Sequence, residues 1–164
     1  MTQPQSDSRA LRNALGRFAT GIAIVTAIDP DGHPIGLTVN SFSAVSLDPA
    51  LVLWCLDNNS HNLEAFRRAS HHAINILADN QQDLSNRFAT WPADRFAGLP
   101  WHAGIGGAPV FPGCCATFEV ANETQHAGGD HIIFVGRVER FGERVDLAPL
   151  LFHAGQYRTL ADKD

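Results

Sequence analysis

The sequence has no long hydrophobic run and no excess of positive charge. None of its apolar stretches approaches the ~18 residues of a membrane-spanning helix. Residues 1–8 are polar and lack the apolar core of a signal peptide. The formal net charge of -5 argues against a general nucleic-acid or anionic-membrane binder. We therefore expect a cytoplasmic protein with no nucleic-acid partner and no membrane partner.

Cysteine is scarce. Cys55, Cys114 and Cys115 are odd in number and are not arranged as a disulfide framework, which suits a reducing compartment. The adjacent pair Cys114 and Cys115 also lacks the spacing of a zinc site. The cysteines therefore predict neither a disulfide scaffold nor a metal centre.

The usual nucleotide-binding loops are missing. The nearest approach to a dinucleotide fingerprint, residues 104–109, lacks the third glycine, follows no expected strand and ends in Pro109. The chain has no Walker A loop, no nucleophile elbow and no pair of carboxylates whose spacing suggests acid–base work. Any nucleotide must be held in another way.

Short apolar segments separated by turns predict one domain rich in strands. We expect residues 1–8 to form a disordered tail and residues 9–164 to form a single domain. The apolar pattern predicts strands at residues 21–28, 35–40, 51–56, 73–77, 114–121, 131–141 and 149–152, and helices at 9–18, 60–69 (N-capped by Ser60) and 79–88. Turn residues 29–32 favour a hairpin, and residues 91–112 are loop-like. A closed or half-closed β-barrel is favoured over a doubly wound parallel sheet, because the strands do not alternate regularly with long helices.

A run of hydroxyl and amide groups at residues 36–49 is the most informative stretch. It starts as an alternating strand and then places Thr38, Asn40, Ser41 and Ser43 close together. Such groups offer the directed hydrogen bonds that a planar heterocycle such as a flavin ring needs. The alternative is a polar edge strand that leads into a turn.

Residues 55–62 join a predicted buried strand to a predicted helix. Exposed backbone N–H groups at a helix start form an anion site, so this segment could bind a phosphate without a lysine. The alternative is an ordinary strand-to-helix turn with a serine cap.

Two further polar stretches could border a cofactor. Residues 126–131 contain two histidines and an aspartate, which fit a metal site, a polar turn or the mouth of a cofactor site. We expect no metal here, because the spacing along a strand edge does not force the ligands onto one side. Residues 151–158 either close the barrel with a strand and a short helix or place Tyr157 beside an aromatic cofactor.

Taken together, these segments resemble the flavin reductase-like family, which includes the small NAD(P)H:flavin oxidoreductase components of two-component monooxygenases. The resemblance runs from about residue 11 to residue 160. The matching strings are, in order, residues 18–26, 36–49, 51–62, 73–77, 87–89, 129–131 and 153–157. The order and spacing of the strings, and no single string, carry the resemblance.

The resemblance implies a mainly β fold, a six-stranded antiparallel FMN-binding split barrel with Greek-key connections, assembled as a homodimer. It implies a flavin reductase that transfers hydride from NADH or NADPH to FMN or FAD and supplies reduced flavin to a separate oxygenase. Two alternatives stay open. One is an FMN-binding protein that holds flavin tightly without efficient NAD(P)H-dependent reduction, and the other is a different oxidase on the same barrel.

The resemblance also implies roles for single residues. Thr38, Val39, Asn40 and Ser41 would line the isoalloxazine ring, Cys55 and Leu56 would border the ring or the ribityl chain, Asn58 would contact the cofactor, Ser60, His61 and Asn62 would serve the phosphate, Arg87, Phe88 and Ala89 would cover the ribityl or adenylate side, and His131 and Tyr157 would meet the nicotinamide. His61 and Asn62 stand where many relatives have Arg or Lys, which predicts weaker or pH-dependent phosphate binding. Ala154 and Gln156 replace frequent arginines, so the choice between NADH and NADPH is left open.

Overall fold

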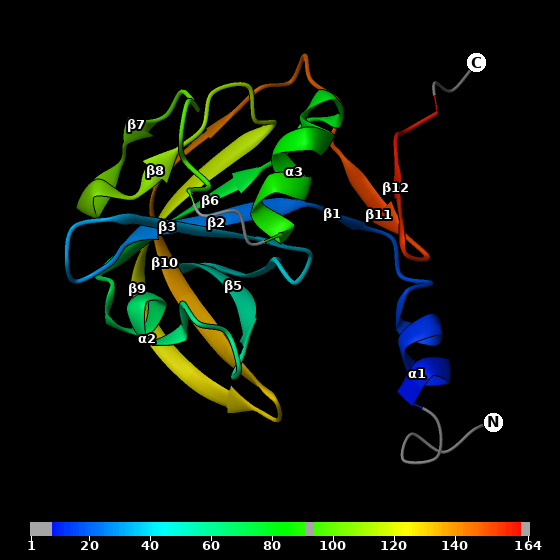
Figure 1. The fold of residues 1–164 in the computed structure, drawn as a ribbon, viewed down its shortest axis with the longest axis horizontal. Coiled ribbons are helices and arrows are strands. Elements are labelled where there is room, and N and C mark those ends of the chain that lie inside the picture. The colour runs from blue at the N-terminus through cyan, green and yellow to red at the C-terminus, as the bar shows by residue number, and fades with distance from the viewer. Residues whose placement is uncertain (1–7, 91–93, 162–164) are drawn as a thin grey trace.

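A computed structural model describes residues 8–90 and 94–161 of the chain (Figure 1). The helices are α1 (Ser8–Leu15), α2 (Leu63–Arg68) and α3 (Gln82–Ala89), with the 3₁₀ turns η1 (Asp79–Gln81) and η2 (Ile105–Gly107). The strands are β1 (Thr20–Gly21), β2 (Ala23–Ile28), β3 (Pro34–Val39), β4 (Ser43–Leu47), β5 (Ala50–Asp57), β6 (His71–Ile76), β7 (His102–Ala103), β8 (Pro109–Val110), β9 (Ala116–Gly128), β10 (His131–Glu143), β11 (Leu151–His153) and β12 (Gln156–Arg158).

One antiparallel sheet forms the body of the molecule. Its seven strands lie in the order β3-β2-β6-β9-β10-β5-β4. The edge strands β3 and β4 follow one another in the chain and are joined by residues 40–42. Because an extended residue spans at most roughly 3.6 Å, the sheet must curl until its two edges approach each other at this link. The predicted mainly β fold with an antiparallel split barrel is confirmed, although the sheet has seven strands where six were expected.

Aromatic rings fill the interior of the curled sheet. Trp54 of β5 stacks on Phe134 of β10 with ring centroids 4.5 Å apart and an interplanar angle of 9°. Phe66 of α2 meets Trp54 edge-on at 5.1 Å, and all three side chains are buried. Burying a large apolar side chain contributes about 1.5–3 kcal/mol, so this cluster fixes α2 against the sheet.

A second apolar cluster lies beneath α3. Phe88 packs edge-on against Phe96 at 5.0 Å and against Phe111 at 5.3 Å. Gly36 of β3 permits this packing, since a Cβ atom there would lie 2.9 Å from Phe88 Cε1. The end of α3 is therefore held directly against β3.

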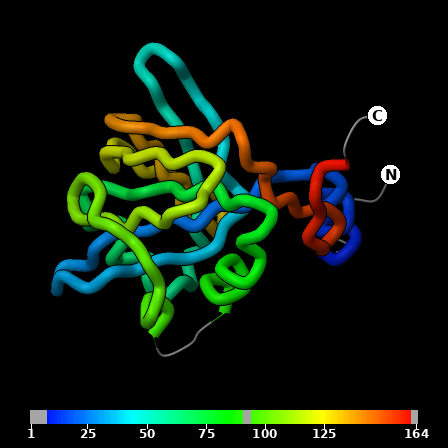
Figure 2. Tube along the Cα trace, turned by 90° about the horizontal axis from the view of Figure 1, so that it is seen from above, coloured from blue at the N-terminus to red at the C-terminus, as the bar shows by residue number. Residues whose placement is uncertain are grey.

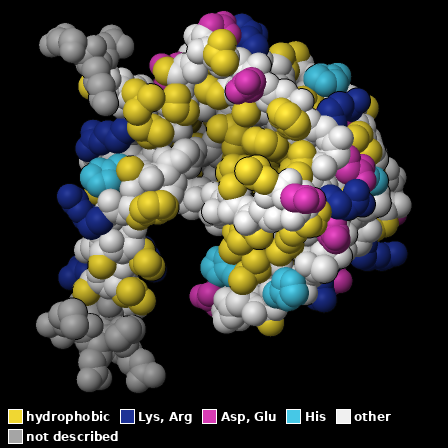
Figure 3. Space-filling view, turned by 180° about the vertical axis from the view of Figure 1, so that it is seen from behind, with side chains coloured by type: hydrophobic (Ala, Val, Ile, Leu, Met, Phe, Trp, Pro, Cys, Tyr) yellow, Lys and Arg dark blue, Asp and Glu magenta, His cyan; other side chains and the backbone are white. Residues whose placement is uncertain are grey.

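The two ends of the described chain form an arm beside the barrel. Both views show α1 and the strands β11 and β12 projecting from the same side of the body (Figures 1 and 2). Strand β1 pairs with β11, and β11 pairs with β12, in a separate three-stranded sheet. Leu15 and Phe18 are 67% and 78% exposed, and they line a groove of about 550 Å³ together with Asn40 and Phe152. Hydrophobic side chains are visible on the arm and on the body across from it (Figure 3).

Most predicted elements are confirmed, with a few corrections. α2 begins at Leu63 and not at Ser60; within the described chain its N-cap residue is Asn62, which makes no side-chain cap hydrogen bond. The helix expected at the end of residues 151–158 is strand β12. α1 ends at Leu15 and begins at Ser8, which the sequence assigned to the tail; residues 1–7 lie outside the described chain. The long loop contains β7, η2 and β8, and its residues 91–93 are also outside the described part.

The helices of the described chain are too short or too polar to span a lipid bilayer.

Candidate functional site

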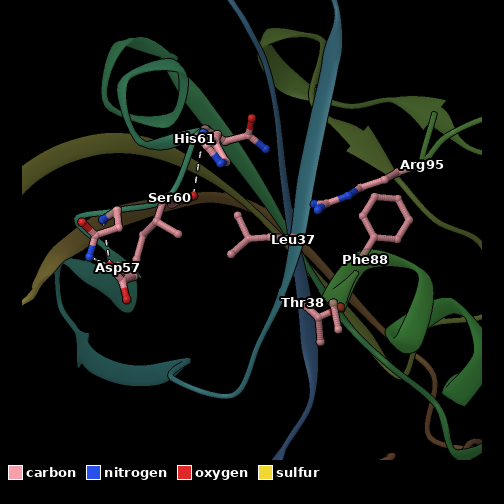
Figure 4. A pocket seen from close by; sticks show the side chains of 11 residues that line it. Leu37, Thr38, Asp57, Ser60, His61, Phe88 and Arg95 are labelled. Carbon is pink, nitrogen blue, oxygen red and sulfur yellow. Dashed lines mark hydrogen bonds between the residues drawn. The ribbon is translucent and has the colours of Figure 1, made fainter. Parts of the chain in front are cut away.

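A pocket of about 350 Å³ opens between β3, the end of β5 and α3 (Figure 4). Such a volume lies within the usual range of small-molecule sites. Five segments of the chain supply its walls: Leu37 and Thr38 of β3, Leu56 and Asp57 of β5, Asn59, Ser60, His61 and Asn62 of the following turn, Phe88 and Ala89 of α3, and Arg95. The pocket therefore combines an apolar wall with a row of polar groups.

The turn after β5 is held by its own hydrogen bonds. Asp57 Oδ1 accepts from the backbone N–H of Asn59 at 2.7 Å and from its side-chain amide at 3.0 Å. The N–H of Ser60 donates to the carbonyl of Asp57 at 2.9 Å. Asn58 is not among the lining residues, and its side-chain amide donates to the carbonyl of Gly129 at 3.2 Å. The turn thus places Ser60, His61 and Asn62 at the pocket, and the hydrogen bond of Asn58 connects the turn to the β9–β10 hairpin.

The polar run on β3 divides between the pocket and the framework. Thr38 reaches the pocket, and its Oγ1 donates to the carbonyl of Ser85 on α3 at 2.7 Å. Val39 belongs to the core, and Asn40 lines the groove beside the arm. Ser41 Oγ accepts from the N–H of Cys55 at 2.9 Å, which joins the middle of the 40–42 link to β5. The structure therefore brings Thr38 to the pocket, while Val39, Asn40 and Ser41 support its surroundings.

Cys55 precedes the pocket-lining Leu56 on β5, so the side chains of the two residues point to opposite faces of the strand. Burial raises the pKa of its thiol, so the thiol stays protonated at neutral pH. Cys55 therefore contributes bulk and backbone hydrogen bonds, with no reactive thiolate.

Arg87 supports the pocket without lining it. Its Nη2 donates to the carbonyl of Ala97 at 2.5 Å and to that of Asp94 at 3.3 Å. These two carbonyls flank Arg95, which does line the pocket. Arg87 thus fixes the loop that carries Arg95, whereas Phe88 and Ala89 line the pocket.

The two residues predicted to meet the nicotinamide lie apart. His131 begins β10 opposite Asp57, and its Nδ1 is 2.7 Å from Asp130 Oδ1. Tyr157 is on the arm, with its hydroxyl 2.9 Å from Ser85 Oγ. The described lining of the pocket includes neither of them. Tyr157 instead contacts Ser85, whose carbonyl accepts the hydrogen bond from Thr38. Ser85 of α3 therefore links the arm to the pocket wall.

The histidines of residues 126–131 have partners nearby. His126 Nε2 lies 3.1 Å from Thr124 Oγ1, and His131 contacts Asp130. In the described chain, the group of three whose ligand atoms come within 4.8 Å of one another is Asp29, Asp31 and His33 at the β2–β3 turn. There Asp29 Oδ1 accepts from the N–H groups of the other two residues, so its carboxylate serves the turn.

Four pocket residues were given no individual role from the sequence: Leu37, Asp57, Asn59 and Arg95. The first three lie inside the strings that carry the family resemblance, so alternation along β3 and the strand-to-turn junction could have suggested them. Arg95 follows a segment with no regular pattern, and only the folded chain brings it to the pocket.

The chain matches the family described as Flavin reductase like domain over residues 15–161. A probable flavin reductase of Rhizobium meliloti (strain 1021) is 46% identical over 159 residues, which is 97% of this chain and 51% of that protein. This chain therefore spans about half the length of that relative. The FMN reductase (NADH) SmoA of Agrobacterium fabrum is 48% identical over 151 residues, covering 92% of this chain and 85% of that protein.

Two further comparisons concern a monooxygenase component and a solved structure. The reductase subunit HsaB of a flavin-dependent monooxygenase from Rhodococcus jostii is 41% identical over 151 residues, covering 92% of this chain and 77% of the subunit. The structure of the Streptomyces globisporus NADH:FAD oxidoreductase SgcE6, in complex with NAD and FAD fragments, matches with a TM-score of 0.92 and 33% identity over 98% of this chain and 96% of that one.

Proposed function

Because this chain belongs to the Flavin reductase like domain family, we propose that it is a flavin reductase, which transfers hydride from NADH or NADPH to FMN or FAD. The pocket carries the proposal. It brings Thr38, Ser60 and Phe88 together from three separate segments, so hydrogen-bonding groups and an apolar wall surround one space. A flavin needs both, since its ring edge takes directed hydrogen bonds and its faces take apolar contact.

The residues of the pocket divide into two ends that suit the two parts of a flavin. Thr38 and Leu56 would border the ring, with Phe88 as the apolar cover. Ser60 and His61 lie on the turn and would hold the phosphate by hydrogen bonds. When bound, the flavin supplies the hydride-accepting chemistry, and the protein supplies binding and orientation.

We propose that the chain works as a homodimer. Leu15 and Phe18 on the arm are largely exposed apolar side chains, and covering them with a second copy would remove that surface from water. Within one chain, His131 and Tyr157 lie on separate elements. In a dimer, His131 of one subunit and Tyr157 of the other could lie in the same site. In this proposal both residues lie on the nicotinamide side.

The reduced flavin would pass to a separate oxygenase component. This proposal is supported by the similarity to HsaB, a monooxygenase reductase subunit. A micromolar dissociation constant corresponds to about -8 kcal/mol, and such an affinity allows the flavin to leave after reduction. The cytoplasmic location and the assignment of residues 9–164 to a single domain stay predictions.

Steady-state oxidation of NADH and NADPH, with added FMN, FAD or riboflavin, tests the activity. We expect flavin-dependent turnover with at least one nucleotide, and none with either would refute the reductase. A flavin that co-purifies and does not wash off, without turnover, would favour the FMN-binding alternative. His131→Ala should lower turnover and leave flavin affinity nearly unchanged, and equal loss of both would reject its place beside the nicotinamide.

Light scattering tests the dimer. Phe18→Glu should shift the protein from dimer to monomer, because a charge would have to be buried in the proposed interface. Val145→Glu is the control, since Val145 is an exposed apolar residue outside the arm. A wild-type monomer at micromolar concentration would refute the proposal.

A further inference from the structure

One wall of the pocket carries a guanidinium group that no sequence motif marks. Arg95 lies in the loop after α3, and it lines the same pocket as Ser60, His61 and Asn62. Figure 4 shows Arg95 and His61 extending from opposite sides toward the space above Leu37. An anion placed there would meet the polar turn on one side and a permanent positive charge on the other.

Several contacts fix the position of this side chain. Arg95 Nη1 donates to the carbonyl of Gly36 on β3 at 2.7 Å. The loop itself is closed by Asp94, whose Oδ1 accepts from the N–H groups of Phe96 at 2.9 Å and Ala97 at 3.0 Å. Arg87 holds the loop from α3, as described above. The guanidinium is thus held in place by the framework, which lowers the entropy that it would lose on binding a ligand.

The packing next to Arg95 holds the same loop from below. Phe96 meets Phe88 edge-on at 5.0 Å and stacks over Phe111 at 6.0 Å. Phe88 is itself part of the pocket wall. Arg95 therefore belongs to the same rigid unit as the apolar cover of the pocket.

The charges around the pocket favour an anion near Arg95. The one carboxylate of the described lining, Asp57, lies at the other end of the pocket in Figure 4, where Asn59 donates two hydrogen bonds to it. Partial burial lowers the pKa of Arg95, and an anionic ligand would offset this cost of desolvation. Arginine also donates paired hydrogen bonds that match the oxygens of a phosphate.

We infer that Arg95 binds the first phosphate of the flavin and makes the pocket select FMN and FAD over riboflavin. This inference rests on the proposed function. It also accounts for the histidine and asparagine at positions 61 and 62, where the sequence predicted a weaker phosphate site: the permanent charge comes from the opposite wall. Arg87 acts as a positioning residue for this contact.

The test measures flavin binding without a pyridine nucleotide. Quenching of flavin fluorescence would give the dissociation constants of FMN, FAD and riboflavin for wild type, Arg95→Gln and Arg95→Lys. Arg144→Gln is the matched control, because it removes one exposed arginine that pairs with Asp146 and does not line the pocket. For Arg95→Gln we expect about tenfold weaker binding of FMN and FAD, as for loss of a charged hydrogen bond, with riboflavin unchanged. The dissociation constants of FMN and FAD for Arg95→Lys should lie between those of Arg95→Gln and wild type.

Three outcomes would overturn the inference. One is equal weakening of FMN and riboflavin by Arg95→Gln, which would mean that Arg95 only supports the wall. Another is a loss confined to FAD, which would place the guanidinium at the second phosphate. The third is a wild type with equal affinity for FMN and riboflavin. A wild type that prefers FMN but shows no flavin-dependent NADH or NADPH oxidation would reject the reductase and leave the assignment of Arg95 standing.

Discussion

His72 of β6 makes the stability of the fold depend on pH. Its side chain is 1% exposed, and its Nε2 lies 2.9 Å from the carbonyl of Phe66. Trp54 Nε1 lies 3.3 Å from His72 Nδ1. Since an indole N–H only donates, Nδ1 must accept and Nε2 must carry the proton that it donates to Phe66. The neutral ring therefore has both nitrogens satisfied, and it has no place for a second proton.

Burial, with a smaller contribution from the neighbouring His71, lowers the pKa of His72 from 6.5 to about 4. The unfolded chain therefore takes up a proton on this side chain as the pH falls below 6.5, while the folded chain resists protonation down to about pH 4. The contribution of the neutral His72 side chain to the free energy of unfolding is present above pH 6.5, and it is lost as the pH falls toward 4. The full loss is about 3 kcal/mol, of which about 2 kcal/mol falls between pH 7.5 and pH 5.

Urea unfolding at pH 7.5, 6.5, 5.5 and 5.0 would measure this effect in wild type and His72→Gln. Glutamine is the matched substitution, because its amide can accept from Trp54 and donate to Phe66 without titrating. Other titrating groups are common to the two proteins, so their contributions cancel in the difference. We expect wild type to lose about 2 kcal/mol more than His72→Gln between pH 7.5 and pH 5. Parallel pH profiles would refute the buried neutral histidine.

Two other substitutions test the packing around the pocket and the loop that carries η2. Gly36→Ala should lower the free energy of unfolding by about 1–3 kcal/mol, because the new Cβ would press on Phe88; an unchanged urea midpoint would show that the ring can move aside. Glu119→Gln should cost about 1.5–3 kcal/mol, since this 6% exposed carboxylate accepts from Arg140 and from the N–H of Ile105. Those contacts lower the pKa of Glu119, so the wild-type advantage over the variant should shrink as the pH falls, and a gap that stays constant down to pH 3 would contradict this origin.

The regular elements of the fold were largely predictable because their signals are local. The β2–β3 hairpin follows from strong turn residues between two strands, and β5 follows from a short apolar run. The start of α2 was not predictable from Ser60, the expected cap. Asp57 accepts hydrogen bonds from Asn59, and this turn delays the helix until Leu63. Whether such a segment forms a turn or an earlier helical turn depends on side-chain to backbone hydrogen bonds, and a pattern of residue types does not specify these.

The site was predictable where chain neighbours stay together in space. Ser60, His61 and Asn62, which were grouped from the sequence, line the pocket together from one turn. The polar run on β3 was harder to interpret, because the strand ends at Val39 and the chain then leaves for the other edge of the sheet. Arg95 was missed because its place depends on packing between α3, β3 and its own loop, and no short motif encodes that arrangement.

The curvature of the sheet has a consequence for how this pocket can evolve. β9 and β10 contain register shifts at 135/136 and at 138/140, and such bulges bend and twist strands. β10 pairs with β5, and the end of β5 forms one side of the pocket, while β3 forms the other side. Gly136 lies at the first shift, where a Cβ atom would come within 2.6 Å of Val120 Cγ2. The spacing of the two sides of the pocket therefore depends on the curvature of the whole sheet, and we expect a substitution at Gly136 to change ligand choice without changing any lining side chain.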